Sequence, residues 1–88
     1  MSEETREVRL KRLKMRSSRR GTKEMDLILM RFAETRLPDL GAEELDRYEA
    51  LLEESDTELY TWISGQIAPP EAHAPMVERI ASEMPQRS

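Results

Sequence analysis

The chain has 88 residues, which is near the lower limit at which one hydrophobic core stabilises a domain. Charged residues make up 36% of it and aromatic residues 5%, which leaves little apolar material to enclose a deep substrate cleft. The absence of cysteine excludes a disulfide framework, a thiolate metal site and a thiol nucleophile. We therefore predict a single domain over residues 1–88, with frayed ends at 1–3 and 85–88.

The two parts of the chain differ in the sign of their charge. Residues 1–24 carry nine Lys and Arg against four Glu, and residues 25–88 carry five Arg against fourteen Asp and Glu. This asymmetry predicts a dipolar molecule with a basic edge and an acidic body. No apolar run approaches the roughly 20 residues that span a bilayer, and the acidic start M-S-E-E lacks the apolar region of a secretory signal. We expect a cytoplasmic protein without membrane insertion.

Residues 4–18 are predicted to form a helix on the domain surface, because their apolar residues give only a thin stripe. The stripe consists of Val8, Leu10, Leu13 and Met15. The many Lys and Arg residues around it allow two interpretations: an arm that neutralises nucleic-acid phosphates, or a solvated helix face. The second is favoured, since no aromatic residue is interleaved for base stacking and the acidic remainder repels a phosphate backbone.

Residues 19–26, with the sequence R-R-G-T-K-E-M-D, join the basic part to the acidic part. Gly21 tolerates close approaches that side chains forbid, and Arg20 and Glu24 are spaced to project from one side of a helix. One interpretation is a surface that docks against another protein. The other is a helix start, with Gly21 as the N-cap and Glu24 at the N3 position, where a carboxylate meets free amide groups. The two interpretations are compatible.

Residues 22–37 show the clearest helical pattern of the chain. Apolar residues recur at helical spacing, and others widen the stripe: Met25, Leu27, Ile28, Leu29, Met30, Phe32, Ala33 and Leu37. So broad an apolar surface predicts burial on more than one side and hence a central helix, with methionines filling gaps in the core. Pro38 is expected to end this helix, and residues 38–41 to form a turn.

Two further helices are predicted over residues 42–54 and 55–64. The first has an inward stripe of Leu45, Tyr48, Leu51 and Leu52, and an acidic face of Glu43, Glu44, Asp46, Glu49 and Glu53 that we expect in solvent. The second begins with a capping box, S-D-T-E at residues 55–58, and buries Leu59, Trp62 and Ile63. Gly65 is predicted to terminate it at the C′ position.

Residues 66–74 contain two adjacent prolines and are predicted to cross the molecule as an extended segment. Pro75 suits the first position of a last helix over residues 75–84, with Met76, Val77 and Ile80 inward. The sequence shows no strand pattern and no internal repeat. The predicted fold is therefore all-α: a small five-helix bundle in which the fourth and fifth helices are short.

The residue inventory favours a binding protein over an enzyme. The sequence has no Walker or dinucleotide-binding glycine motif, and its lone histidine cannot build a zinc site by itself. His73, with Glu71 nearby, is a candidate general base, but we expect a solvated linker histidine because no partner nucleophile can be named. Tyr60 and Trp62 are candidates for stacking on a cofactor ring, although their alternation with apolar residues favours the core.

Several features in a fixed order carry a family resemblance. Residues 20–24 read R-G-T-K-E and match an R-G-x-x-E motif, and an apolar helix follows over residues 25–32. Further on, L-L-E at residues 51–53 precedes Asp56, and L-Y-T-W stands at residues 59–62. In these features, over residues 9–80, the chain resembles the small bacterial and mitochondrial assembly factors that promote covalent attachment of FAD to the flavoprotein subunit of succinate dehydrogenase.

The resemblance implies a five-helix fold and binding to the flavoprotein subunit of succinate dehydrogenase or of the related fumarate reductase. It implies that Arg20, Gly21 and Glu24 form the contact surface, to which we add the neighbouring Arg16 and Arg19. It implies neither a catalytic centre nor a metal, and no cofactor of the factor's own, because the FAD belongs to the client flavoprotein. We expect the free factor to be monomeric and to bind no nucleic acid.

The mechanistic hypothesis assigns a role to each motif residue. Arg20 offers a bidentate fork to a client carboxylate or carbonyl, Gly21 permits close backbone approach, and Glu24 pairs with a client cation or orients Arg20. Ser17 and Ser18 stand where many relatives have an aromatic residue, and Ala74 stands where they often have a Thr. The competing hypothesis is a nucleic-acid-associated or toxin-neutralising helical protein that works through the basic N-terminal segment. A third possibility is that the domain binds FAD directly, but the sequence contains no phosphate-binding element that supports it.

Overall fold

The computed structural model describes residues 4–18 and 20–83, and within these ranges all regular structure is helical. The elements are α1 (Arg6–Ser17), α2 (Lys23–Thr35), a 3₁₀ helix η1 (Leu37–Asp39), α3 (Ala42–Leu52), α4 (Asp56–Ile63) and α5 (Ala74–Ser82). The prediction of an all-α fold with five α-helices is confirmed.

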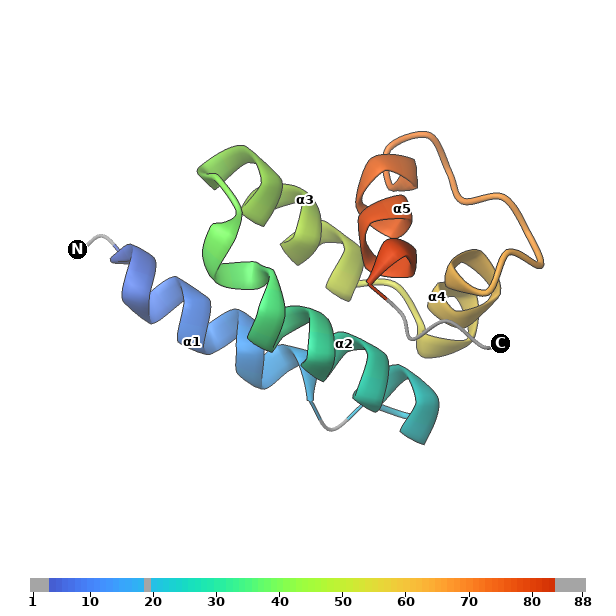
Figure 1. Ribbon diagram of the computed structural model, residues 1–88, viewed down its shortest axis with the longest axis horizontal. Helices are drawn as coiled ribbons and strands as arrows, with labels where there is room; N and C mark the ends of the chain where they lie inside the picture. Colours follow the sequence, from blue (N-terminus) through green and yellow to red (C-terminus); the bar gives the residue numbers. More distant parts are fainter. Residues whose placement is uncertain (1–3, 19, 84–88) are drawn as a thin grey trace.

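The helices form an elongated molecule of 45 × 24 × 23 Å. In Figure 1, α1 and α2 lie side by side and run in opposite directions, and α3 runs in the same direction as α1. The short helices α4 and α5 lie together at the end of the molecule away from the N-terminus. The connection between α1 and α2 therefore reaches the end at which α4 begins.

Helix α2 is the central helix, as predicted, because it contacts α1, η1, α4 and α5. Its buried side chains are Met25, Leu29, Phe32 and Ala33. Leu27, however, is 62% exposed, so part of the broad apolar stripe lies outside the core. The helix ends at Thr35, two residues earlier than predicted, because Pro38 has no amide hydrogen to continue the ladder and the chain tightens into η1.

The remaining helices bury the residues that their patterns predicted. The predicted inward residues of α3, α4 and α5 are all buried, and Leu37 and Leu40 complete the core between α2 and α3. Helix α1 buries only Leu13 and Ser17, while Val8 and Met15 are 53% and 73% exposed. The thin stripe of α1 is therefore even thinner than its spacing indicated.

One buried polar pair ties α1 to α3. The Tyr48 hydroxyl lies 2.5 Å from Ser17 Oγ, and Ser17 Oγ donates to the Leu13 carbonyl at 2.8 Å. Burial raises the pKa of the Tyr48 phenol to about 12, and the ring stacks on Phe32 with centroids 5.5 Å apart. Ser17 thus has a structural role in this chain.

The ends of α4 follow the predicted capping chemistry in part, since Ser55 caps its start and Gly65 ends it, but the return bond of the capping box from the Glu58 side chain is not formed. Ser55 Oγ accepts from the Glu58 amide at 3.3 Å, and Gly65 has φ +86°, a value that favours glycine. The Gln66 amide bonds back to the Thr61 carbonyl at 2.9 Å, which completes the turn that ends α4. Helix α5 starts at Ala74 without a side-chain cap, so Pro75 stands in its second position rather than its first, and it ends at Ser82, two residues earlier than predicted.

The arginines of α1 pair with the acidic face of α3. Arg9 Nη2 lies 2.5 Å from Asp46 Oδ1, and Arg12 Nη1 lies 2.8 Å from Glu49 Oε2. Arg16 Nη2 lies 2.5 Å from Glu53 Oε2. Hydrogen bonding to Arg12 lowers the pKa of Glu49, whose side chain is only 30% exposed.

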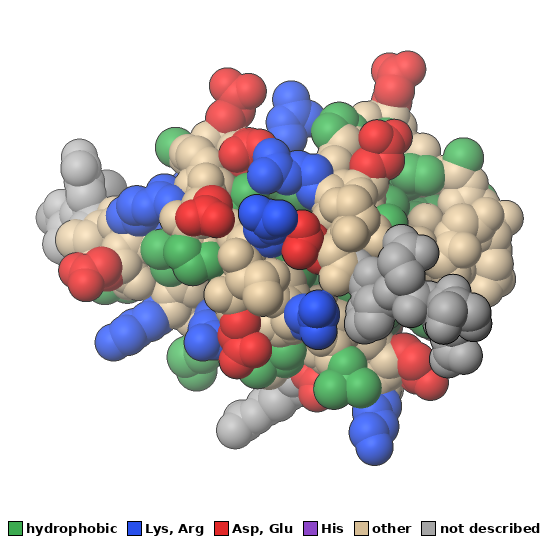
Figure 2. Space-filling view, viewed as in Figure 1, with side chains coloured by type: hydrophobic (Ala, Val, Ile, Leu, Met, Phe, Trp, Pro, Cys, Tyr) green, Lys and Arg blue, Asp and Glu red, His purple; other side chains and the backbone are tan. Residues whose placement is uncertain are grey.

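This pairing corrects two expectations about charge. The basic run of α1 is not simply a solvated face, and the two signs are not separated into an edge and a body. The acidic face of α3 is exposed as expected, with Asp46 70% and Glu53 67% exposed, but it also pairs with α1. Parallel helices with charges repeating every three or four residues bring opposite signs together, which net charges summed over segments cannot show. Over the middle of the face drawn in Figure 2, Lys and Arg side chains lie beside Asp and Glu side chains.

Candidate functional site

The connection between α1 and α2 is held by an ion pair between Arg20 and Asp56, the first residue of α4. Arg20 Nε donates to Asp56 Oδ1 at 2.8 Å, and both side chains are only 13% exposed. The rest of the guanidinium donates to three backbone carbonyls at 3.2–3.3 Å, those of Arg16, Leu52 and Glu54. Arg20 is therefore engaged within the chain, and its guanidinium is not the free fork that the sequence suggested.

Gly21 extends this contact, because its amide also donates to Asp56, through Oδ2. A Cβ added at Gly21 would lie 3.0 Å from Asp56 Oδ2, closer than nine in ten of the contacts that real Cβ atoms make. Glycine does permit a close approach here, as expected, but the approaching group is a carboxylate of the same chain. Arg20, Gly21 and Asp56 form a cluster that we call the latch, and it ties the α1–α2 connection to the start of α4.

Glu24 lies outside the latch. Thr22, not Gly21, is the N-cap of α2: its Oγ1 accepts from the Met25 amide at 3.3 Å, so Glu24 occupies N2 rather than N3. The helix-start interpretation was thus right about α2 and wrong by one residue about its cap. The Glu24 side chain is exposed and makes no ion pair with the described residues 4–18 and 20–83. Its carboxylate faces solvent at the positive end of the α2 macrodipole.

An open cleft of about 290 Å³ lies between the start of α2 and α4, beside the latch. Its lining is rich in hydrogen-bond acceptors: Thr22, Glu24, Asp56, Thr57, Tyr60 and Thr61. Tyr60 is 37% exposed, whereas Trp62 is buried, so the prediction of a core position holds for the tryptophan and is wrong for the tyrosine. A carboxylate beside an exposed aromatic ring suits a cationic side chain better than an anionic ligand.

Two further arginines were predicted at the site. Arg16 stands in the last turn of α1, pairs with Glu53, and offers its carbonyl to Arg20. It therefore borders the latch without facing the cleft directly. Arg19 lies outside the described residues.

His73 is packed rather than solvated, which corrects the expectation of a linker histidine in water. Its Nε2 lies 3.1 Å from Glu54 Oε2, its side chain is 12% exposed, and its ring centroid lies 5.7 Å from that of Trp62. It precedes α5 and joins that helix to the α3–α4 turn. No group of three metal-ligating side chains occurs within residues 4–18 and 20–83.

The sequence pointed to the motif but not to its internal partner. Asp56 stands 36 residues after Arg20. It was assigned to a capping box and counted in the family resemblance, and neither indicated that the two side chains meet. The exposure of Tyr60 was also missed, because an eight-residue helix gives too few turns to separate its inner face from its outer one. None of the helices in the described part of the chain has the length and apolar content to cross a membrane.

Comparison with known proteins gives one family. A family model described as flavinator of succinate dehydrogenase matches residues 11–84. The chain is 37% identical over 84 residues to the FAD assembly factor SdhE of Acetobacter pasteurianus, covering 94% of this chain and 77% of that protein.

Fungal proteins are similar over a shorter stretch. The chain is 46% identical over 59 residues to the mitochondrial succinate dehydrogenase assembly factor 2 of Meyerozyma guilliermondii, covering 67% of this chain and 44% of that protein. It is 40% identical over 70 residues to the protein of the same name from Schizosaccharomyces pombe, covering 80% of this chain and 50% of that protein. The chain thus spans about half the length of these fungal relatives.

Proposed function

Because the chain belongs to the family of flavinators of succinate dehydrogenase, we propose that it is an assembly factor for that enzyme's flavoprotein subunit. In this role it binds the immature subunit and promotes covalent attachment of FAD to it. The flavoprotein of the related fumarate reductase is a second proposed client. The names of the relatives, FAD assembly factor and succinate dehydrogenase assembly factor, support the proposal.

The observation that carries the proposal is the division of the family motif between a fixed part and an exposed part. The latch holds Arg20 and Gly21 against Asp56, and Glu24 stands free beside the cleft. A surface that is already rigid loses little conformational entropy when a partner binds. Gly21 and Glu24 are proposed to touch the client, and Arg20 to hold them in place.

The proposed contribution of the chain is orientation rather than chemistry. The client supplies the FAD and the residue that becomes attached to it, and the factor holds the client in the reactive arrangement. Proximity and orientation alone contribute roughly 7–11 kcal/mol in favourable cases. The proposed factor has no cofactor of its own, since the FAD belongs to the client, and the exposed Glu24 carboxylate beside the cleft disfavours a pyrophosphate there.

The proposed setting follows from the relatives. The fungal proteins are named as mitochondrial and the Acetobacter protein is bacterial, so the proposed place of action is the cytoplasm of a bacterium or the mitochondrial matrix. The free factor is proposed to be a monomer that pairs one to one with its client.

The competing nucleic-acid hypothesis loses its main argument. The described arginines of α1 are engaged: Arg9, Arg12 and Arg16 with acids of α3, and Arg6 with the carbonyls of Pro38 and Leu40 at 2.7 Å. Paired guanidinium groups have to give up these partners before they can bind phosphates.

The test is flavinylation of the purified flavoprotein subunit with FAD, followed by fluorescence of the covalent flavin in a denaturing gel. We expect the wild-type chain to raise the signal and Glu24→Gln to raise it less. The matched control is Glu78→Gln, because Glu78 is exposed on α5 and away from the cleft. A wild-type chain that leaves the signal unchanged would refute the proposed function.

A further inference from the structure

The cations of α1 fall into two groups that face different neighbours. The arginines turn toward α3 and the segment after η1, as described above. Lys11 and Lys14 form no ion pair with any residue in 4–18 or 20–83, and both line hollows between α1 and α2. The two lysines are thus the cations of α1 that form no ion pair, and they lie over α2, where Glu34 lines one of the hollows with them.

Apolar side chains accompany these lysines. A hollow of about 410 Å³ is lined by Lys11, Lys14, Met15, Ser18 and Met30. Met15 is 73% exposed, although it lies beside the core helix. Exposed apolar residues that gather around a hollow, rather than standing singly, mark interaction sites.

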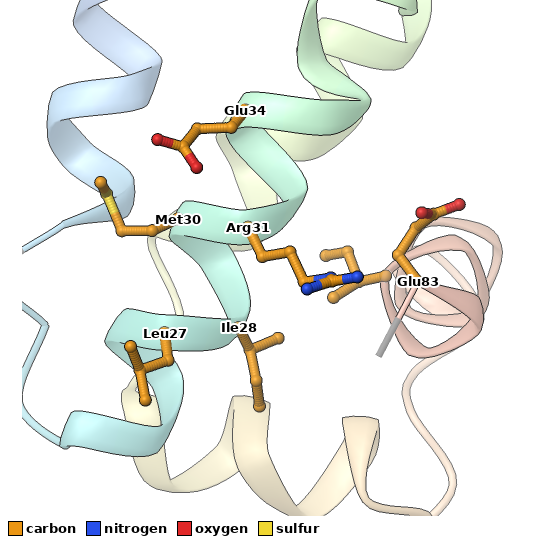
Figure 3. Close-up of a pocket in the computed structure, with 7 residues that line it drawn as sticks. Leu27, Ile28, Met30, Arg31, Glu34 and Glu83 are labelled. Carbon is orange, nitrogen blue, oxygen red and sulfur yellow. The ribbon is translucent and has the colours of Figure 1, made fainter. Parts of the chain in front are cut away.

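The apolar strip continues across α2. Figure 3 shows Leu27 and Met30 on the side of α2 that faces α1, with Arg31 extending toward α5. Met30 also lines the neighbouring groove of about 350 Å³ between α2 and α5, together with Leu27 and Ile80. Lys11, Lys14, Met15, Leu27 and Met30 form one surface, which we call the Lys–Met face.

The Lys–Met face adjoins the candidate site. Leu27 follows Glu24 by three residues on α2, so the two side chains stand one turn apart on neighbouring parts of the helix surface. Both are exposed. A partner that contacts Glu24 therefore has a direct path along α2 onto Leu27 and Met30.

We propose that the Lys–Met face seats an acidic amphipathic segment of the same flavoprotein client, as a contact additional to Glu24. This inference rests on the proposed function. Lys11 and Lys14 share one hollow with a single carboxylate, that of Glu34, so the face keeps an excess of positive charge that attracts carboxylates. The exposed Met15 and the half-buried Met30 accept an apolar side chain of variable shape. The two contacts have opposite signs, because Glu24 takes a basic group of the client and the lysines take acidic ones, which fixes the orientation of the complex.

The charge arm of the test compares Lys14→Glu with Arg47→Glu, which makes the same charge change on α3, where Arg47 is exposed and away from the Lys–Met face. We expect Lys14→Glu to raise the Kd for the purified flavoprotein subunit by about tenfold at low salt, and by less at high salt. Arg47→Glu should stay near the wild-type Kd. Equal Kd values for the two variants would overturn the inference.

The apolar arm compares Met15→Ser with Ile67→Ser, since Ile67 is 59% exposed and stands after α4, away from the Lys–Met face. We expect only Met15→Ser to weaken client binding, by about threefold to tenfold. Anionic vesicles of phosphatidylglycerol and phosphatidylcholine are tested in parallel. If Lys14→Glu and Met15→Ser abolish vesicle binding and leave client binding intact, the face recognises a membrane and the inference is wrong.

The outcomes separate this inference from the proposed function. If Glu24→Arg weakens client binding and the Lys–Met variants do not, the proposed function is supported and the inference about the Lys–Met face is wrong. If the wild-type chain does not bind the flavoprotein at all, both fall. If both sets of variants weaken binding while their unfolding curves match that of the wild type, both are supported.

Discussion

The two halves of the R-G-x-x-E motif have different surroundings. Arg20 is 13% exposed and bonded to a carboxylate and three carbonyls, whereas Glu24 is exposed beside an open cleft. Gly21 stands between them, exposed to solvent on one side and bonded to Asp56 on the other. The sequence suggested that the whole motif is one binding surface. In the structure, Arg20 belongs to the internal latch and Glu24 is exposed to a partner.

This difference teaches that the loss of function of a motif variant has two separable causes. Removal of the inner half changes the stability and position of the α1–α2 connection. Removal of the outer half changes only what the surface presents to a partner. Unfolding and client binding, measured on the same variants, separate the two causes.

The largest expected effect is that of Arg20→Ala on stability. Its loss leaves the Asp56 carboxylate, itself 13% exposed, without its cationic partner, and it removes three carbonyl contacts. We expect the free energy of unfolding to fall by about 3 kcal/mol in urea or thermal titrations. This differs from the sequence-based hypothesis, in which Arg20 offers a fork to the client and its replacement leaves the fold intact. Arg47→Ala on α3, which removes an exposed arginine, is the control, and equal losses in the two variants would contradict the latch.

A smaller effect is expected for Gly21→Ala. The added methyl group meets Asp56 Oδ2 at 3.0 Å, and Arg20 prevents that carboxylate from moving away freely. We expect a loss of about 1 kcal/mol in unfolding free energy. The same substitution in an Asp56→Ala background should cost little, because the close neighbour is gone. A cost that is unchanged in that background would place the strain elsewhere.

The smallest effect concerns the pairing of α1 with α3, whose contribution to stability is present at neutral pH and is lost in acid. Hydrogen bonding to Arg12 lowers the pKa of Glu49 from its ordinary value of 4.5. A carboxyl with a lowered folded-state pKa contributes stability that is present above 4.5 and is lost as the pH falls through the lower folded value. Stability curves from pH 7 down to acid should therefore fall less steeply for Glu49→Gln than for wild type. Identical acid limbs would show that the pair adds no stability.

Local sequence patterns were sufficient to predict the helices, but they could not predict which charged side chains pair. The apolar spacing of residues 25–33, the serine cap at Ser55 and the glycine stop at Gly65 act within one or two helical turns, and the structure has them as predicted. The pairing of Arg9 with Asp46 joins residues 37 apart. It depends on α1 and α3 lying parallel in the same register, which no spacing within either helix specifies.

The site was predictable in position and not in internal arrangement. The motif and the resemblance located residues 20–24, and the structure places this segment at the surface beside a cleft. The inward turn of Arg20 could not be predicted, because it depends on the carbonyls of Leu52 and Glu54, which become acceptors only where α3 ends and the chain turns. The capping pattern at residues 55–58 places Asp56 at the start of a helix and does not predict its contact with Arg20.

The most direct test of the central claim is the Kd of Glu24→Arg for the purified flavoprotein subunit, measured by calorimetry beside Glu78→Arg, which makes the same charge change on an exposed position of α5. The account predicts that Glu24→Arg raises the Kd by about tenfold or more, while its unfolding free energy falls by no more than about 1 kcal/mol, the cost of a reversed charge at the start of α2. Glu78→Arg should bind as the wild type does. Equal affinities for the two variants would show that the exposed half of the motif does not contact the client.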